Sequence, residues 1–275
     1  MINCELSEHE FRQISQLIYN ICGIDLHDGK KELVKARLGK RLRGKNFRSF
    51  SEYYRYVTST EGTDELTVMI DAISTNLTQF FREDKHFTRL QNILSSFLTK
   101  SSRNGGPPKL RIWSAGCSTG EEPYTIAMVL RELIAPGSVD VKIMATDIST
   151  DVLKTATTGI YNENKVKNVP PDLLRKYFLK GHRDWKGFYR AKDDLKNMIE
   201  FRRMNLKDPI TLRDSFDVIF CRNVMIYFDK QMQSSLVGKF YECIREGGYF
   251  FIGHSESLTG ITHHFKYIEP SVYCR

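Results

Sequence analysis

The sequence predicts an α/β fold with a Rossmann-like, mainly parallel sheet, a small all-helical N-terminal domain and a small antiparallel insert. Three observations indicate this fold. Residues 110–128 combine an apolar run, a loop with Gly116 and Gly120, and a helical pattern, which is the strand–loop–helix unit of nucleotide-type folds. Strand and helix patterns alternate after this unit, as they do in parallel sheets. The first 75 residues show helical periodicity instead.

Residues 1–75 are expected to form four short helices. Ser7 and Glu10 form a capping-box pattern before the first helix, and Ser49 and Glu52 form another before the third. Between them, a basic helix spans about residues 30–44 and ends at a glycine. Apolar residues recur on one face over 63–73, which predicts the fourth helix. Together these patterns predict a helical N-terminal domain.

Residues 76–108 form a connecting segment in this interpretation. It begins with a polar stretch, continues as an amphipathic helix from about Phe87 to Leu98, and ends in a loop over 101–108. In the domain 109–275 we expect strands over 110–114, 141–146 and 216–221, a helix over 230–245, and further strands over 249–253 and 265–273. Short strand patterns around turns, the last over 199–202, predict the antiparallel insert at about 179–203.

The composition is that of a soluble globular protein, with 41% hydrophobic and 27% charged residues. No apolar run reaches the ~20 residues of a membrane helix, and the first residues lack a signal-peptide pattern. The six cysteines include no CxxC pair, so we expect reduced thiols in a cytoplasmic protein. The seven histidines show no metal-ligand spacing, so no metal is expected.

The net charge of +8 is concentrated in the basic helix and the residues after it. Nine basic residues and one acid, Glu32, lie between Lys30 and Arg48, and 9 − 1 = +8; the rest of the chain has 32 charges of each sign. Such a segment attracts an anionic partner, and the three candidates are a nucleic acid, an anionic membrane and an acidic protein surface. The alternative is an ordinary solvated helix face.

The glycine loop differs from a dinucleotide-binding loop in two ways. It contains GxxxG rather than GxGxxG, and Glu121 and Glu122 follow it directly. A helix N-terminus normally favours a pyrophosphate, which two carboxylates would repel. The loop therefore favours a cationic ligand, and S-adenosylmethionine carries a sulfonium and an ammonium but no phosphate. The alternative is that the two glutamates only complement the helix dipole.

Other candidate residues follow the remaining strands. Asp147 ends the second strand, where an acid accepts hydrogen bonds from ribose hydroxyls; the alternative is a helix cap. Asn205 and Leu206 follow the presumed third strand and are suited to adenine, unless Asn205 is only a turn residue. The fourth strand leads into Arg222 and Asn223. The absence there of an Asn/Asp-Pro-Pro-Tyr motif disfavours a nucleobase-nitrogen or glutamine-amide substrate.

Three segments together resemble the chemotaxis receptor methyltransferase (CheR) family: TNLTQFFR at 75–82, WSAGCSTGEEPY at 113–124 and CRNVMIYF at 221–228. The order of parts also matches, so the resemblance covers nearly the whole chain. It implies a class I S-adenosylmethionine-dependent methyltransferase that esterifies glutamate side chains on the cytoplasmic helical bundle of bacterial chemoreceptors. The products would be glutamyl methyl esters and S-adenosylhomocysteine.

The resemblance also implies roles for particular residues. Arg82 and Tyr227 are expected at the methyl-transfer centre. The insert resembles a part that, in some members, docks a peptide at the receptor C-terminus. The basic helix is expected to attract glutamate-rich receptor helices through Lys35, Arg37, Arg41 and Arg43. The expected cofactor-binding residues, with the loop glycine included, are Asn76, Thr78, Arg82, Gly116, Glu122, Asp147, Asn205, Leu206, Arg222 and Asn223.

Two alternative functions stay open. One is an RNA methyltransferase that uses the basic helix as a phosphate footprint, but the sequence shows no basic platform interleaved with aromatic residues, which disfavours nucleic acid as a partner. The other is a non-catalytic module that binds S-adenosylmethionine or receptors without turnover. The presence of Glu122, Asp147, Arg222 and Tyr227 argues against such a decayed site.

Overall fold

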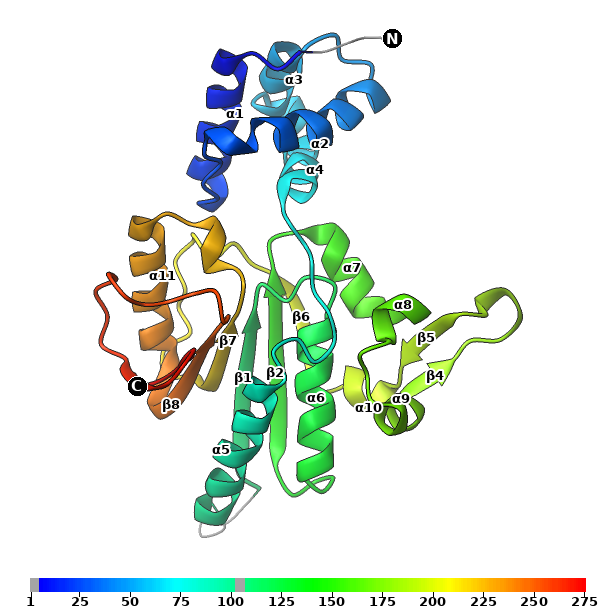
Figure 1. The fold of residues 1–275 in the computed structure, drawn as a ribbon, viewed down its shortest axis with the longest axis vertical. Coiled ribbons are helices and arrows are strands. Elements are labelled where there is room, and N and C mark those ends of the chain that lie inside the picture. The colour runs from blue at the N-terminus through cyan, green and yellow to red at the C-terminus, as the bar shows by residue number, and fades with distance from the viewer. Residues whose placement is uncertain (1–4, 102–106) are drawn as a thin grey trace.

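The structure is a computed structural model that describes residues 5–101 and 107–275, so most of the loop predicted over 101–108 lies outside it. A helical N-terminal domain lies above one edge of a seven-stranded sheet, and the non-helical residues 74–84 connect the two (Figure 1). Within the described residues, no helix combines the length and the hydropathy that crossing a membrane requires.

The N-terminal domain contains four α-helices at the predicted places. Ser7 and Glu10 form the capping box, since each side chain accepts a hydrogen bond from the backbone N–H of the other. Ser49 caps the third helix, but Glu52 accepts from the N–H of Arg48 instead of returning to Ser49. The helices are α1 (Glu8–Cys22), α2 (Lys31–Gly44), α3 (Phe50–Val57) and α4 (Thr63–Ile73).

One buried ion pair fixes the basic helix α2 in this domain. Arg41 donates from Nε and Nη2 to the two carboxylate oxygens of Glu65 on α4, both at 2.7 Å. Glu65 is 4% exposed and also accepts from the Tyr53 hydroxyl. Burial by itself raises the pKa of Glu65, but the hydrogen bonds from Arg41 and Tyr53 and the charges of Arg41 and Lys45 outweigh it, so the pKa is lowered. The partly exposed Arg41 thus links α2 to a buried carboxylate of α4.

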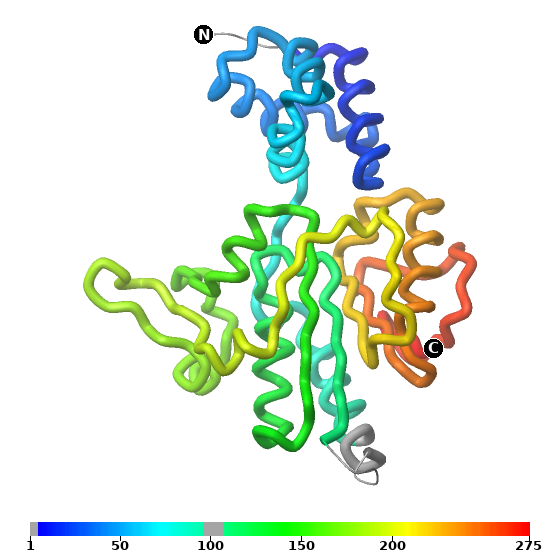
Figure 2. Tube along the Cα trace, turned by 180° about the vertical axis from the view of Figure 1, so that it is seen from behind, coloured from blue at the N-terminus to red at the C-terminus, as the bar shows by residue number. Residues whose placement is uncertain are grey.

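The main sheet has the strand order β6-β2-β1-β7-β8-β10-β9. The first five of these strands run parallel, whereas β10 is antiparallel to both of its neighbours. The chain leaving β6 passes across the edge that faces the N-terminal domain before it enters β7 (Figure 2). The strands are β1 (Lys109–Ala115), β2 (Asp140–Asp147), β6 (Ile199–Arg203), β7 (Phe216–Cys221), β8 (Ile244–Ile252), β9 (Lys266–Glu269) and β10 (Val272–Cys274).

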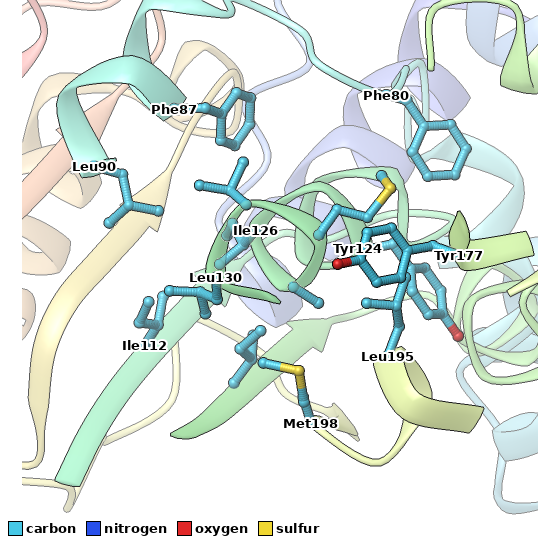
Figure 3. Packing of buried hydrophobic residues seen from close by; sticks show 14 of the residues in the cluster. Phe80, Phe87, Leu90, Ile112, Tyr124, Ile126, Leu130, Tyr177, Leu195 and Met198 are labelled. Atoms are coloured by element: carbon cyan, nitrogen blue, oxygen red, sulfur yellow. The ribbon is translucent and has the colours of Figure 1, made fainter. Parts of the chain in front are cut away.

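Helices cover both faces of this sheet. Successive residues of a strand point to opposite faces, so Ile112 of β1 packs with α5 (Lys85–Ser101) and α6 (Glu121–Leu133), while Trp113 packs with α11 (Lys230–Cys243). Figure 3 shows the first cluster, in which Phe87 and Leu90 of α5 approach the apolar side of α6. The two cores hold the carboxyl ends of the parallel strands at one edge, where α/β proteins bind ligands.

The predicted limits of the antiparallel insert are wrong at both ends. Its three-stranded sheet consists of β3 (Ile160–Asn162), β5 (Phe188–Ala191) and β4 (Phe178–Lys180), in that order. The run at 199–202, assigned to the insert by sequence, is β6, which pairs in parallel with β2. An edge strand with exposed charges resembles a hairpin strand in sequence, and only the tertiary pairing distinguishes them.

Two further strand boundaries differ from the prediction. The strand β8 begins at Ile244, directly after α11, rather than at the predicted residue 249. The predicted strand over 265–273 is two short antiparallel strands, β9 and β10, with a turn at Ser271, which has φ of 64°. The polar segment before α5, for which no secondary structure was predicted, is non-helical.

We predict that Arg41→Ala destabilises the protein by about 1–3 kcal/mol, because the Glu65 carboxylate stays buried after losing its bidentate partner. The pKa of Glu65 is lower in the folded than in the unfolded state. The ion pair therefore stabilises the protein fully at pH values above the pKa of Glu65 in the unfolded state, and this stabilisation is lost as the pH falls through the pKa of Glu65 in the folded state. The loss is therefore larger at pH 7 than at about pH 3. Urea denaturation at both pH values measures it.

Arg43→Ala is the matched control, because Arg43 is exposed on the same helix. We expect it to change the unfolding free energy by no more than ~0.5 kcal/mol. Equal losses in the two variants would contradict a specific role for the Arg41–Glu65 pair.

Candidate functional site

An open cleft of about 1250 Å³ lies between the N-terminal domain and the carboxyl edge of the sheet. Its walls come from the end of α1 and the start of α2, from the connecting segment, and from the loops after β1, β2, β6 and β7. The lining includes every residue predicted for the cofactor or for methyl transfer: Asn76, Thr78, Arg82, Gly116, Glu122, Asp147, Asn205, Leu206, Arg222, Asn223 and Tyr227.

The glycine loop needs both of its glycines for packing. Gly116 has a φ of 79°, and a Cβ at this position would overlap the Val224 side chain of the loop after β7. Gly120 has a φ of 95°, precedes the first residue of α6, and would bring a Cβ within 2.9 Å of Ala156 Cβ and the Tyr161 hydroxyl. These left-handed conformations are costly for residues with a Cβ. The glycines are therefore required by the close packing of the loop against its protein neighbours, and Gly116 also lines the cleft.

Of the two glutamates after the loop, only Glu122 lines the cleft. Its carboxylate accepts from Ser114 Oγ at 2.7 Å and from Arg222 Nη1 at 3.0 Å. Glu121 is fully buried and pairs with Lys165, at 2.9 Å, and with the Thr119 hydroxyl. Glu121 thus links α6 to the insert, and Glu122 supplies the negative charge of the cleft.

Asp147 lines the cleft, and its carboxylate accepts hydrogen bonds from two loops. Oδ2 accepts from the Ser118 N–H of the glycine loop at 2.8 Å, and Oδ1 accepts from the N–H of Ser149, the N-cap of α7 (Thr150–Thr158), at 2.9 Å. Burial raises the pKa of Asp147, and the backbone hydrogen bonds oppose that rise. The carboxylate joins two loops of the cleft and lines the cavity beside them.

Asn205 lines the cleft, but its amide already has protein partners. Nδ2 donates to the Ile21 carbonyl at the end of α1 at 2.8 Å, and Oδ1 accepts from the Lys207 N–H, which forms an Asx turn. Lys207 Nζ donates to the carbonyls of Tyr19 and Asn20. These bonds favour the turn interpretation of Asn205 and attach the loop after β6 to the N-terminal domain.

Arg222 is the most completely surrounded charge of the site, with 6% of the residue exposed. Nη1 pairs with Glu122 at 3.0 Å and Nη2 pairs with Glu83 at 2.9 Å. Nη2 also donates to the Arg82 carbonyl, and the guanidinium lies over the Phe87 ring. Arg222 therefore ties the connecting segment, α6 and β7 together. Sequence analysis missed Glu83, although it follows TNLTQFFR directly.

The loop after β7 is held by a second carboxylate that sequence analysis missed. Glu256 accepts from the backbone N–H groups of Asn223, Val224 and Ile226 at 2.9, 3.0 and 3.3 Å. It accepts from Gly253 N as well, at 2.6 Å. Asn223 adopts a φ of 60°, which is rare outside glycine. The four bonds fix a strained loop that leads directly to Tyr227.

Tyr227 is held from the other side by the N-terminal domain. Its carbonyl accepts from Asp25 N at 2.8 Å, and Ile24 forms an isolated antiparallel bridge with Phe228. The nearby residues Asp25, Lys30 and Leu33 also line the cleft. This wall could not be predicted, because no local sequence pattern indicates that the turn after α1 meets the loop that carries Tyr227.

The basic helix divides its charges between internal and exposed positions. Lys35 pairs with Glu5 at 3.0 Å, and Arg37 donates to the carbonyls of Ile73 and Ser74 at the start of the connecting segment. Arg41 is bound to Glu65, as described above. Of the four predicted docking residues, Arg43 is the exposed one, and Lys40, which was not among the four, is exposed on the same helix.

The fold and the cleft define a class I S-adenosylmethionine-dependent methyltransferase. The lining supports this, because the carboxylates of Glu122 and Asp147 face the cleft near the N-terminus of α6, which would otherwise favour a phosphate. Comparison with known proteins agrees. Residues 76–274 match the family described as "CheR methyltransferase, SAM binding domain", and residues 9–74 match "CheR methyltransferase, all-alpha domain".

Relatives match over nearly their whole length. The chain is 42% identical over 275 residues to a chemotaxis protein methyltransferase of Borreliella burgdorferi, covering 99% of this chain and 96% of the relative. It is 39% identical over 269 residues to the chemotaxis protein methyltransferase of Escherichia coli, covering 98% and 91%. The chain belongs to the CheR family of chemotaxis methyltransferases, and its cofactor is S-adenosylmethionine.

We predict that Glu256→Ala lowers the unfolding free energy by about 1–3 kcal/mol, because four backbone N–H groups, three of them in partly buried bonds, lose their acceptor. Hydrogen exchange of the amides of Asn223, Val224 and Ile226 accelerates, and methyl transfer slows because this loop supports Tyr227. Hydrogen-exchange mass spectrometry and an activity assay measure the two effects. The control is Ser255→Ala, an exposed neighbour. Unchanged exchange in Glu256→Ala would show that the carboxylate does not hold the loop.

Proposed function

We propose that this protein is a cytoplasmic protein-glutamate O-methyltransferase that acts on the helical bundle of methyl-accepting chemotaxis receptors. The observation that carries the proposal is the cleft itself. Glu122 and Asp147 line it and suit a cationic donor, and its opening lies next to the start of the basic helix α2. The names of the relatives, which are chemotaxis protein methyltransferases, support the class of substrate. S-adenosylmethionine supplies the methyl group and leaves as S-adenosylhomocysteine.

The charges of the cleft suit the donor. Glu122 and Asp147 are the proposed partners of its cationic amino group and its ribose, respectively, and each carboxylate is already oriented by bonds to Ser114 or Ser118. Leu206 and the backbone after β6 form the wall proposed for adenine. Because these hydrogen bonds hold both acids before any ligand binds, their side chains lose little conformational entropy on binding.

The chain needs no general base for the reaction. A glutamate side chain has a reference pKa of ~4.3, so it is an anion at pH 7 and already a nucleophile. The remaining tasks are to hold its oxygen at attack distance and to exclude water. The exposed side chains of Leu77 and Ile226 lie on segments that flank the cleft, and we assign them to apolar contact with the receptor helix.

The cations of the site have different tasks in this proposal. A cation fixed beside the substrate carboxylate would stabilise the starting anion more than the transition state, where that charge has decreased. The charge of Arg222 is balanced by Glu83 and Glu122 and lies below the surface. Arg82 donates to the Leu77 carbonyl at 3.1 Å. We assign Arg82 to orienting the carboxylate of the substrate or of the cofactor at the mouth of the cleft.

Tyr227 is the proposed positioning group for the substrate. Its backbone is fixed by Asp25 and by the loop that Glu256 holds. Its hydroxyl has no hydrogen-bond partner among the described residues, so it is available to the incoming carboxylate. RNA as a substrate is less well supported, because the cations of the lining, Lys30, Arg82 and Arg222, are matched in number by its acids, and the exposed Lys40 and Arg43 of α2 do not line the cleft.

We expect that the protein, incubated with radiolabelled S-adenosylmethionine and receptor-containing membranes, transfers base-labile label to the receptor band. Base lability identifies a carboxyl methyl ester. Tyr227→Phe is expected to lower kcat by about tenfold or more, as lost positioning does, with the affinity for S-adenosylmethionine unchanged in calorimetry. Label on RNA would select the RNA methyltransferase alternative, and binding of the donor without label on any substrate would select the non-catalytic one.

We also predict that the double variant Lys40→Glu/Arg43→Glu raises the KM for receptor several-fold and leaves the affinity for S-adenosylmethionine intact. Both residues are exposed on α2, and reversing them removes the attraction to a glutamate-rich helix. The effect shrinks at high salt, where surface charges are screened. Lys266→Glu on the far edge strand β9 is the matched control. A KM as low as in the wild type would rule out docking through α2.

A further inference from the structure

The fold brings three metal-binding side chains together, although the sequence shows no metal-ligand spacing. Glu83 precedes α5, His86 lies in its first turn, and His254 follows β8. One ligand atom of each residue lies within 4.8 Å of the others. The His86 and His254 rings meet edge to face with centroids 4.7 Å apart, and His86 Nδ1 is 3.5 Å from Glu83 Oε2.

His86 is the unusual member of this group. It is 2% exposed, and neither of its ring nitrogens has a hydrogen-bond partner. Buried polar atoms are nearly always satisfied, and a missing partner calls for an explanation such as an ion. An imidazole nitrogen with a free lone pair is the group that binds a metal ion.

We propose that Glu83, His86 and His254 bind a divalent transition metal ion, with Zn²⁺ as the expected occupant. Two imidazole nitrogens and one carboxylate oxygen suit Zn²⁺, whereas Mg²⁺ and Ca²⁺ require oxygen ligands. Tetrahedral coordination needs the ligand atoms about 3.4 Å apart. The exposed His254 side chain is free to close that distance, and solvent supplies the fourth ligand at the same side.

Two neighbouring positive charges disfavour a bound cation and therefore limit the affinity of this site for the metal ion. Arg222 pairs with Glu83 at 2.9 Å, and the N-terminus of α5 carries the positive end of a helix dipole. Asn223 Nδ2 also approaches Glu83 Oε1, at 3.5 Å. The ion must compete with these donors for the carboxylate. We therefore expect a dissociation constant on the order of micromolar, weaker than a structural zinc site.

The competition for Glu83 couples the metal to the methyl-donor cleft, and this step rests on the proposed function. Arg222 connects Glu83 to Glu122, so an ion that draws the Glu83 carboxylate away leaves Arg222 to pair more strongly with Glu122. Glu122 then has less negative charge to offer a cationic donor. Metal and S-adenosylmethionine should weaken each other's binding, and by the same factor.

The first measurement is calorimetric titration of the full chain, freed of metal by chelation, with ZnCl₂. We expect one equivalent to bind, and His254→Ala to bind about tenfold or more weakly because it lacks a ligand. His9→Ala, an exposed histidine of α1, is the matched control and should bind like the wild type. Co²⁺ should give the visible bands of a tetrahedral complex in the wild type and in His9→Ala only.

The absence of zinc binding, or equal binding by His254→Ala and the wild type, would overturn the metal site. The second measurement is the affinity for S-adenosylmethionine with and without saturating Zn²⁺. We expect Zn²⁺ to weaken it about fivefold in the wild type and not in His254→Ala. If zinc binds and this affinity does not change, the coupling is wrong. If the metal-free protein does not bind the donor at all, the proposed function fails while the metal site stands.

Discussion

The buried guanidinium of Arg222 is the interaction on which the cleft depends. It joins three segments that are far apart in sequence: the end of the connecting segment through Glu83, the start of α6 through Glu122, and its own strand β7. A buried charge is tolerated only when it is paired and hydrogen-bonded. Here two carboxylates, a carbonyl and the Phe87 ring surround one cation, so each of these groups constrains the others. The carboxylate of Glu122, which lines the cleft, is thereby held in place.

The N-terminal domain is a wall of the active cleft rather than a tethered accessory. Its first helix ends in carbonyls that accept from Asn205 and Lys207, and the following turn bonds to the backbone of Tyr227. On the opposite side, Asp71 of α4 accepts from the N–H and hydroxyl of Thr150 at the start of α7. Because both contacts meet loops that line the cleft, a receptor docked on this domain would lie close to the reacting centre.

The basic helix shows how far a charge count can mislead. The segment from Lys30 to Arg48, which includes this helix, has a surplus equal to the net charge of the whole chain, yet Lys35, Arg37 and Arg41 are bound to partners within the domain or to the connecting segment. The charges that remain exposed, such as Lys40 and Arg43, are the ones suited to an acidic partner. Internal pairing of this kind lowers the charge available for steering, while it fixes the helix that presents the rest.

Local chemistry was enough to predict much of this protein from the order of its residues. Capping boxes, helical periodicity and the glycine loop act over a few positions, so the helices of the N-terminal domain, α6 and the strands β1, β2 and β7 could be placed from sequence. The family resemblance, rather than a local pattern, indicated several of the residues that line the cleft, such as Asn76, Arg82 and Tyr227. Tertiary contacts decided the rest. The assignment of β6 to the main sheet, the paired state of Arg41, the supporting acids Glu83 and Glu256, and the meeting of His86 with His254 all depend on segments that only folding brings together. No pattern within a single segment reports such contacts, because their energies arise from neighbours that are distant in the chain.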